Sequence, residues 1–130
     1  MLGSSYNHRK YLEENIENDP HIKISSNLDA ETLSALMFNT DIAIVPASTI
    51  GLEALSSQMV LLTGTTAANQ NNIYKGLVGE DAVIGIGDFN NLDCNTLLEK
   101  VKSASKKFKD YTFKKQVSAN DTLLSIYQLL

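Results

Sequence analysis

Residues 41–54 read DIAIVPASTIGLEA and join an apolar run to a polar turn and a second apolar segment. The run over 41–45 is continuously apolar after its first residue, which is typical of a central strand in a parallel sheet. Ser48 and Thr49 precede the second segment, and hydroxyl side chains in that place favour the start of a helix. We predict a strand over 41–45 and a helix over 50–57 that Thr49 caps.

The segments on both sides repeat this order of strand and helix. Short apolar runs predict further strands over 21–25, 59–63 and 82–86. The helical spacing of apolar residues predicts helices over 7–16, 29–39, 69–77, 92–108 and 121–130. The alternation predicts an α/β fold, a Rossmann-like doubly wound parallel sheet, in which ligands bind at the carboxyl ends of the strands.

The composition is that of one globular domain of 130 residues, with 43% hydrophobic and 20% charged residues. Eleven Lys and Arg residues against fifteen Asp and Glu residues give a formal net charge of -4, which argues against nucleic acid as a partner. No apolar run approaches the roughly 20 residues of a membrane span, so we expect a cytoplasmic protein. Because Cys94 is the single cysteine, we expect an inert thiol and no metal site. No dinucleotide-binding motif is present either, and we expect no cofactor.

Residues 1–5 read MLGSS and have the character of the end of a strand with the turn that follows it. Most of such a strand would lie before Met1. We therefore expect the chain to be a C-terminal piece of a larger, two-domain protein, whose N-terminal domain is its partner.

Three predicted loops follow strands and should meet at one edge of the sheet. The first contains Gly3, Ser4 and Ser5, where a glycine permits close backbone approach and two hydroxyls can donate hydrogen bonds to phosphate or sugar oxygens. The loop lacks the G-x-G-x-x-G spacing of dinucleotide-binding loops, and an ordinary strand-to-helix turn explains it equally well.

The second loop gives the sharpest signal in the chain. With Thr49 as the cap, the free N–H groups of Ile50 and Gly51 would point at the carboxyl edge of the sheet, where a diphosphate could bind. Glu53 lies four residues after Thr49 on the same helix face, so its carboxylate could accept hydrogen bonds from two adjacent ribose hydroxyls. The alternative is a solvated acidic residue that interacts favourably with the helix dipole.

The third loop, 65–72, is rich in hydroxyl and amide side chains. The amides of Asn69 and Gln70 both donate and accept hydrogen bonds, which suits neutral sugar hydroxyls. The alternative is a polar loop that caps the next helix. His8 and His21 have no nucleophile or paired carboxylate at the spacing of a catalytic triad, so the residues predict no catalytic group.

Residues 41–54, followed after another strand by Asn69 and Gln70, resemble the C-terminal half of the GT-B fold nucleotide-sugar enzymes. The likeness is greatest to the UDP-sugar hydrolases of the pseudaminic acid pathway and extends more distantly to the MurG-type glycosyltransferases. It covers about residues 2–108. In these families the C-terminal domain holds the UDP portion of the donor.

The resemblance implies a role for each matching residue of the second loop. Glu53 would bind the ribose. The diphosphate would be bound by Ser48, Thr49 and the amide of Ile50. As the bond between sugar and phosphate breaks, helix-end amides in this place would stabilise the charge that grows on the diphosphate.

The resemblance also implies roles outside the second loop. Asn69 and Gln70 would lie beside the sugar or the phosphates, and Leu28 would lie near the uracil. The turn over residues 3–5 would correspond to the first glycine-rich loop of the family, with one glycine where the family has two.

The predicted function is UDP-sugar binding in an enzyme of bacterial surface polysaccharide or nonulosonic acid biosynthesis, which hydrolyses or transfers the sugar. The resemblance places the catalytic histidine in the N-terminal domain, so we expect the isolated chain to be inactive. The alternative is a non-catalytic α/β module for signalling or protein interaction. A phosphoacceptor receiver of that class would place an aspartate at the end of a central strand, whereas Asp41 stands at the start of one.

Overall fold

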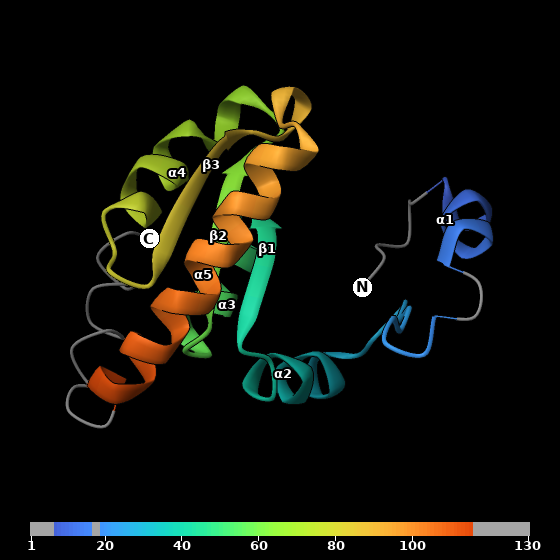
Figure 1. Ribbon diagram of the computed structural model, residues 1–130, viewed down its shortest axis with the longest axis horizontal. Coiled ribbons are helices and arrows are strands. Elements are labelled where there is room, and N and C mark those ends of the chain that lie inside the picture. The colour runs from blue at the N-terminus through green and yellow to red at the C-terminus, as the bar shows by residue number, and fades with distance from the viewer. Residues whose placement is uncertain (1–6, 17–18, 116–130) are drawn as a thin grey trace. The chain divides into compact units, whose positions relative to one another are not determined.

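The computed structural model describes residues 7–16 and 19–115 (Figure 1). The chain forms two compact parts, Met1–Ala35 and Leu36–Leu130. The predicted first loop and the predicted helix over 121–130 lie outside the described residues.

The first part contains helix α1 (Arg9–Ile16) and the beginning of helix α2 (Ala30–Phe38), as predicted. None of the residues of α1 is buried. A side-chain ion pair of 2.7 Å between Arg9 and Glu13 joins successive turns of this helix. The Arg9 guanidinium also donates a hydrogen bond of 2.9 Å to the Ser26 hydroxyl, which ties α1 to the segment before α2.

The strand predicted over 21–25 is wrong, because these residues form a turn and an irregular segment. The backbone N–H of His21 donates to the Asp19 carboxylate at 2.9 Å, and the N–H of Ile22 donates to the Asp19 carbonyl at 3.2 Å. Alternation of polar and apolar residues specifies a strand only where a neighbouring strand pairs with it. Ile22 is instead 49% exposed.

The second part is built on three parallel strands in the order β1 (Ile42–Pro46), β2 (Val60–Thr65) and β3 (Val83–Asp88). These are the strands predicted from the apolar runs, each shifted by about one residue. The most continuous run is not central, however, since β2 is the middle strand of the described sheet and β1 lies at its edge. Ile44 of β1 is accordingly 45% exposed, whereas the first five residues of β2 are all buried.

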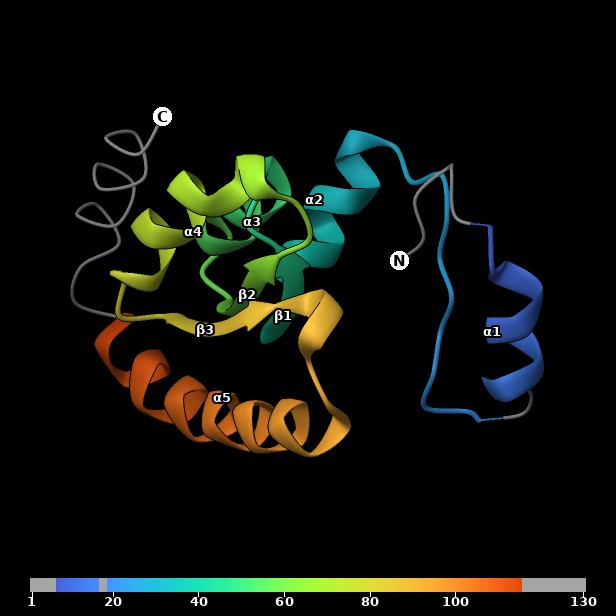
Figure 2. The ribbon, with the colours of Figure 1, turned by 90° about the horizontal axis from the view of Figure 1, so that it is seen from above.

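Helices α3 (Thr49–Ser56) and α4 (Asn71–Val78) cover one face of this sheet, and α5 (Cys94–Lys115) covers the other (Figure 2). Both connections step in the same direction across the sheet, so right-handed crossovers place α3 and α4 on the same side. The core under α5 contains Val60 and Leu62 of β2, Ile86 of β3 and Ala104 of α5. The second part is thus a Rossmann-like α/β layer structure.

Within the described residues, no helix combines the length and the apolar character that a membrane crossing requires.

Candidate functional site

The loops that follow the three strands lie at one edge of the sheet, which we call the carboxyl edge (residues 47–49, 66–70 and 89–93). The parallel register pairs Pro46 with Gly64 and Thr65 with Asp88, so all three strands end together. The Ala47 N–H also donates a hydrogen bond of 2.8 Å to the Gly64 carbonyl, which fixes the first of these loops against β2.

Helix α3 begins one residue earlier than predicted, with Ser48 and not Thr49 as its cap. The Gly51 N–H donates to the Ser48 carbonyl at 2.9 Å, so the expectation that this amide is free is wrong. Within the described residues, the N–H groups of Thr49 and Ile50 donate to no acceptor, and no side chain caps the helix. The amino end of α3 therefore presents two open amides at the carboxyl edge.

Glu53 is exposed and lies one turn after Thr49 on the same face of α3. The opposite face is buried through Leu52, Ala54 and Leu55, which pack the helix against the sheet. Within the described residues, the carboxylate of Glu53 makes no ion pair and accepts no hydrogen bond. This environment agrees both with the predicted ribose contact and with the alternative of a solvated acidic residue.

The loop after β2 contains a short 3-10 turn, η1 (Ala68–Gln70), before α4 begins. The side-chain oxygen of Gln70 accepts a hydrogen bond of 2.8 Å from the Thr66 N–H, and the Thr66 hydroxyl lies 3.3 Å from the same oxygen. The side-chain carbonyl of Gln70 therefore holds its own loop closed, and among the residues that the structure describes its NH2 group donates no hydrogen bond. Asn69 is exposed at the middle of the turn.

Sequence reasoning missed a polar cluster at the end of β3, formed by Asp88, Asn90 and Asn91. One oxygen of the Asp88 carboxylate accepts hydrogen bonds of 2.9 Å from the backbone and side-chain nitrogens of Asn90, and the other accepts one of 2.9 Å from the Asn91 amide. The Asn90 amide also lies 3.5 Å from the Thr66 carbonyl, so it links two loops of the carboxyl edge. The available signal was an aspartate at the end of a strand followed closely by two asparagines.

Leu28 belongs to the first part of the chain and is half-buried. Its neighbour Asp29 caps α2, because the Asp29 carboxylate accepts a hydrogen bond of 2.7 Å from the Thr32 N–H. Hydrogen bonds from the backbone and side chain of Thr32 hold the pKa of Asp29 below its ordinary value. The uracil contact of Leu28 stays a prediction, and Gly3, Ser4 and Ser5 lie outside the described residues.

Cys94, the first residue of α5, is a free and exposed thiol. Among residues 7–16 and 19–115, no three His, Cys, Asp or Glu side chains are grouped in a way that could hold a metal ion. The chemistry available at the carboxyl edge is hydrogen bonding by backbone amides, hydroxyls and side-chain amides, together with the exposed carboxylates of Glu53, Asp88 and Asp93.

No family model, curated protein or solved structure matches the chain.

Proposed function

We propose that the carboxyl edge binds the UDP portion of a UDP-sugar, and that the chain is the C-terminal half of a GT-B type enzyme. The observation that carries the proposal is the amino end of α3, which presents the open amides of Thr49 and Ile50 one turn before the exposed Glu53. Open sheets of this kind bind ligands at the carboxyl ends of their strands, and helix amino ends favour anions there.

In this proposal, the diphosphate accepts hydrogen bonds from the amides of Thr49 and Ile50 and from the hydroxyls of Ser48 and Thr49. The positive end of the helix dipole adds to the attraction. The carboxylate of Glu53 accepts hydrogen bonds from the two ribose hydroxyls. UDP would contact both sets of groups at once if its ribose lay one helical turn from its diphosphate, since successive turns are about 5.4 Å apart.

Asn69 and the NH2 group of Gln70 would then face the sugar or the phosphates from the neighbouring loop. The side-chain carbonyl of Gln70 already accepts hydrogen bonds from Thr66. The side chain can therefore donate a hydrogen bond to a ligand oxygen but has little capacity to accept one. A phosphate oxygen or a sugar hydroxyl acting as acceptor suits that arrangement.

The whole enzyme would hydrolyse or transfer the sugar in the cytoplasm, for the synthesis of a bacterial surface glycan. The acid or base would come from the N-terminal domain, and this chain would contribute to the rate by stabilising the charge that grows on the leaving diphosphate.

A signalling receiver is the second candidate, and Asp88 is the observation that favours it, since this aspartate ends a parallel strand. Both oxygens of its carboxylate accept hydrogen bonds from Asn90 and Asn91, however. A carboxylate engaged in this way is a poorer phosphoryl acceptor than an open one.

Amide NMR during titration with UDP tests the proposal. We expect saturable shifts that are confined to residues 48–53 and 66–70. A chain that shows no saturable shift at millimolar UDP would leave the receiver or another interaction module as the better assignment, and a phosphoryl donor such as acetyl phosphate would then be tested at Asp88.

A further inference from the structure

Helix α5 concentrates the positive charge of an acidic chain. It contains seven of the eleven Lys and Arg residues and only two of the fifteen Asp and Glu residues. The formal net charge of -4 therefore conceals a strongly basic helix beside a strongly acidic remainder.

The lysines of α5 do not all point the same way, because one face of the helix is fixed by packing. Val101, Ala104 and Phe108 face the core under the sheet. Lys100, Ser103 and Lys107 follow at intervals of three and four residues on the flank beside β3. Two positively charged side chains, with a hydroxyl between them, are thus aligned along this strand.

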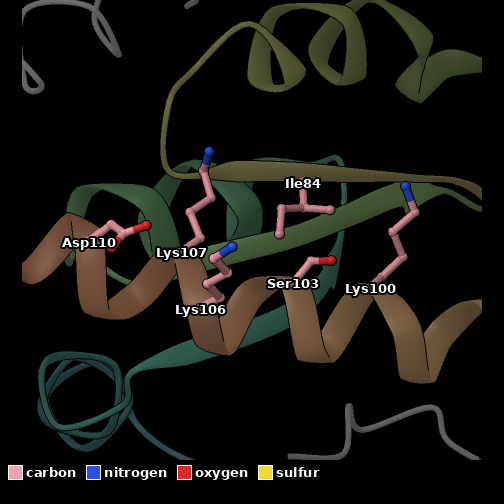
Figure 3. A pocket seen from close by; sticks show the side chains of 6 residues that line it. All are labelled: Ile84, Lys100, Ser103, Lys106, Lys107 and Asp110. Atoms are coloured by element: carbon pink, nitrogen blue, oxygen red, sulfur yellow. The ribbon is translucent and has the colours of Figure 1, made fainter.

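These side chains line a groove of about 340 Å³ between α5 and β3. Figure 3 shows the side chains of Lys100 and Lys107 rising from α5 towards the strand, with Ser103 between them and Ile84 projecting from β3. Lys106 and Asp110 complete the lining. We call this the lysine groove.

The lysine groove holds more positive than negative charge. Lys107 is paired with Asp81 over a long distance of 3.7 Å, and Asp81 is largely exposed. Within the described residues, neither Lys100 nor Lys106 forms an ion pair. Lys102 on the same helix differs, since Glu99 neutralises it at 3.0 Å.

We propose that the lysine groove binds the phosphate group of a small phosphorylated molecule. Ammonium groups are suitable donors to phosphate oxygens, and Lys100 and Lys107 can both neutralise the charge. The Ser103 hydroxyl between them donates a hydrogen bond of 3.0 Å to the Glu99 carbonyl, and it would turn away from that carbonyl to contact a phosphate. The two lysines are two turns apart, about 10 Å along the helix, so their flexible side chains can converge on one phosphate or diphosphate. The volume is at the lower end of the range for small-molecule sites.

The position of the site on the flank of α5 beside β3 favours a small ligand over a flat anionic membrane. A membrane surface would engage the outward lysines Lys102 and Lys109 at least as strongly as the two lysines of the groove. The site also differs from the carboxyl edge, since it is lined by Ile84 near the start of β3 and by the middle of α5. The inference therefore does not depend on UDP binding.

Titration with inorganic pyrophosphate at low salt, followed by the NMR signals of α5, tests the inference. We expect saturable shifts at Lys100, Ser103 and Lys107. The double variant Lys100→Gln/Lys107→Gln should weaken binding by about tenfold or more, as expected when charged hydrogen bonds are lost. The matched control Lys102→Gln/Lys109→Gln removes the same charge from the same helix and should change affinity by less than about twofold, as distant exposed charges are screened.

Equal losses in the two double variants would overturn the inference, because they would show a diffuse basic surface. Binding to vesicles of phosphatidylcholine and phosphatidylserine that depends on both pairs, without saturable pyrophosphate shifts, would assign the helix to a membrane instead. All four lysines lie on the surface, and a retained amide spectrum would verify that each variant is folded. Titration with UDP separates the two proposals, since shifts in α5 alone would contradict the proposed function and not the lysine groove.

Discussion

The carboxyl edge and the lysine groove are both sites for anions, but they are built from different parts of the chain. At the carboxyl edge, the donors are backbone amides whose position follows from the direction of β1 and the start of α3. In the lysine groove, the donors are long side chains whose position depends on which face of α5 packs against the sheet. A backbone site can therefore be located from the order of strands and helices, whereas a side-chain site needs the packing.

A substitution where β2 pairs with β3 should have the largest effect on stability, because this pairing supports the carboxyl edge directly. A side chain on Gly64 would overlap the Gly87 carbonyl oxygen where the register shifts at this point of the sheet. We expect Gly64→Ala to lower the free energy of unfolding by about 3 kcal/mol, at the upper end of the cost of overpacking. Urea denaturation measures the change.

Gly87→Ala is the matched control in the same pair of strands. This glycine has a φ of 77°, yet no atom lies within 4 Å of an added Cβ. Gly87→Ala should lower the free energy of unfolding only by the penalty for an L side chain at positive φ, about 1–2 kcal/mol. If Gly64→Ala lowers the free energy of unfolding no more than Gly87→Ala does, the close approach of the two strands does not stabilise the carboxyl edge.

Glu53→Ala should have the next largest effect, on binding. If the carboxylate binds both ribose hydroxyls, its removal should lower the affinity for UDP by about ten- to a hundredfold. A charged hydrogen bond contributes about 1.5–3 kcal/mol, which corresponds to this change. The same substitution should change the affinity for 2′,3′-dideoxy-UDP little, because that ligand lacks the two ribose hydroxyls that the carboxylate would bind. Isothermal titration calorimetry on both ligands measures the difference.

Glu80→Ala provides a control that removes an acidic side chain from the opposite, amino end of β3. Its backbone carbonyl accepts a hydrogen bond of 3.1 Å from the Val83 N–H, which the substitution retains. UDP affinity should stay unchanged in this variant. Equal losses for the two ligands in Glu53→Ala would remove Glu53 from the ribose contact and would leave the carboxyl edge with backbone donors alone.

The sequence predicted the described strands and helices of the second part well, because their apolar residues are spaced for the structures they form. The apolar run of β1 and the hydroxyls before α3 are local signals, and both elements are confirmed. The segment 21–25 has an equally regular alternation and forms no strand, since pairing depends on a neighbour that alternation does not specify.

Details of the candidate site were harder to predict, for two physical reasons. We predicted Thr49 as the cap of α3, whereas the structure has Ser48, because two adjacent hydroxyl residues both favour this position. The Gly51 N–H donates its backbone hydrogen bond to the Ser48 carbonyl, and this bond distinguishes the two. The cluster around Asp88 was missed because one of its contacts joins two loops that are far apart in the sequence. The link from Asn90 to the Thr66 carbonyl spans 24 positions of the chain.

The smallest expected effect concerns the first turns of α3 and α5, which differ in whether a side chain caps them. The Asp93 carboxylate accepts hydrogen bonds from the Thr96 hydroxyl at 2.6 Å and from the Thr96 N–H at 2.9 Å, whereas no side chain caps α3. These bonds, chiefly the one from the hydroxyl, hold the pKa of Asp93 below its ordinary value of 3.8. The folded state therefore gains stability from this group above that pH, and loses it as the pH falls through the lower pKa.

Amide NMR during acid titration should show the N–H of Thr96 shifting with the protonation of Asp93, at a pH below the ordinary value, while the N–H of Ile50 stays constant. In Asp93→Asn, the shift at Thr96 should vanish, and stability to urea should depend less on pH in this range. A shift at Ile50 with the same acid midpoint would mean that a carboxylate caps α3 in solution. The amides that the proposed diphosphate requires would then be occupied, and the carboxyl edge would lose the feature that distinguishes it from the start of α5.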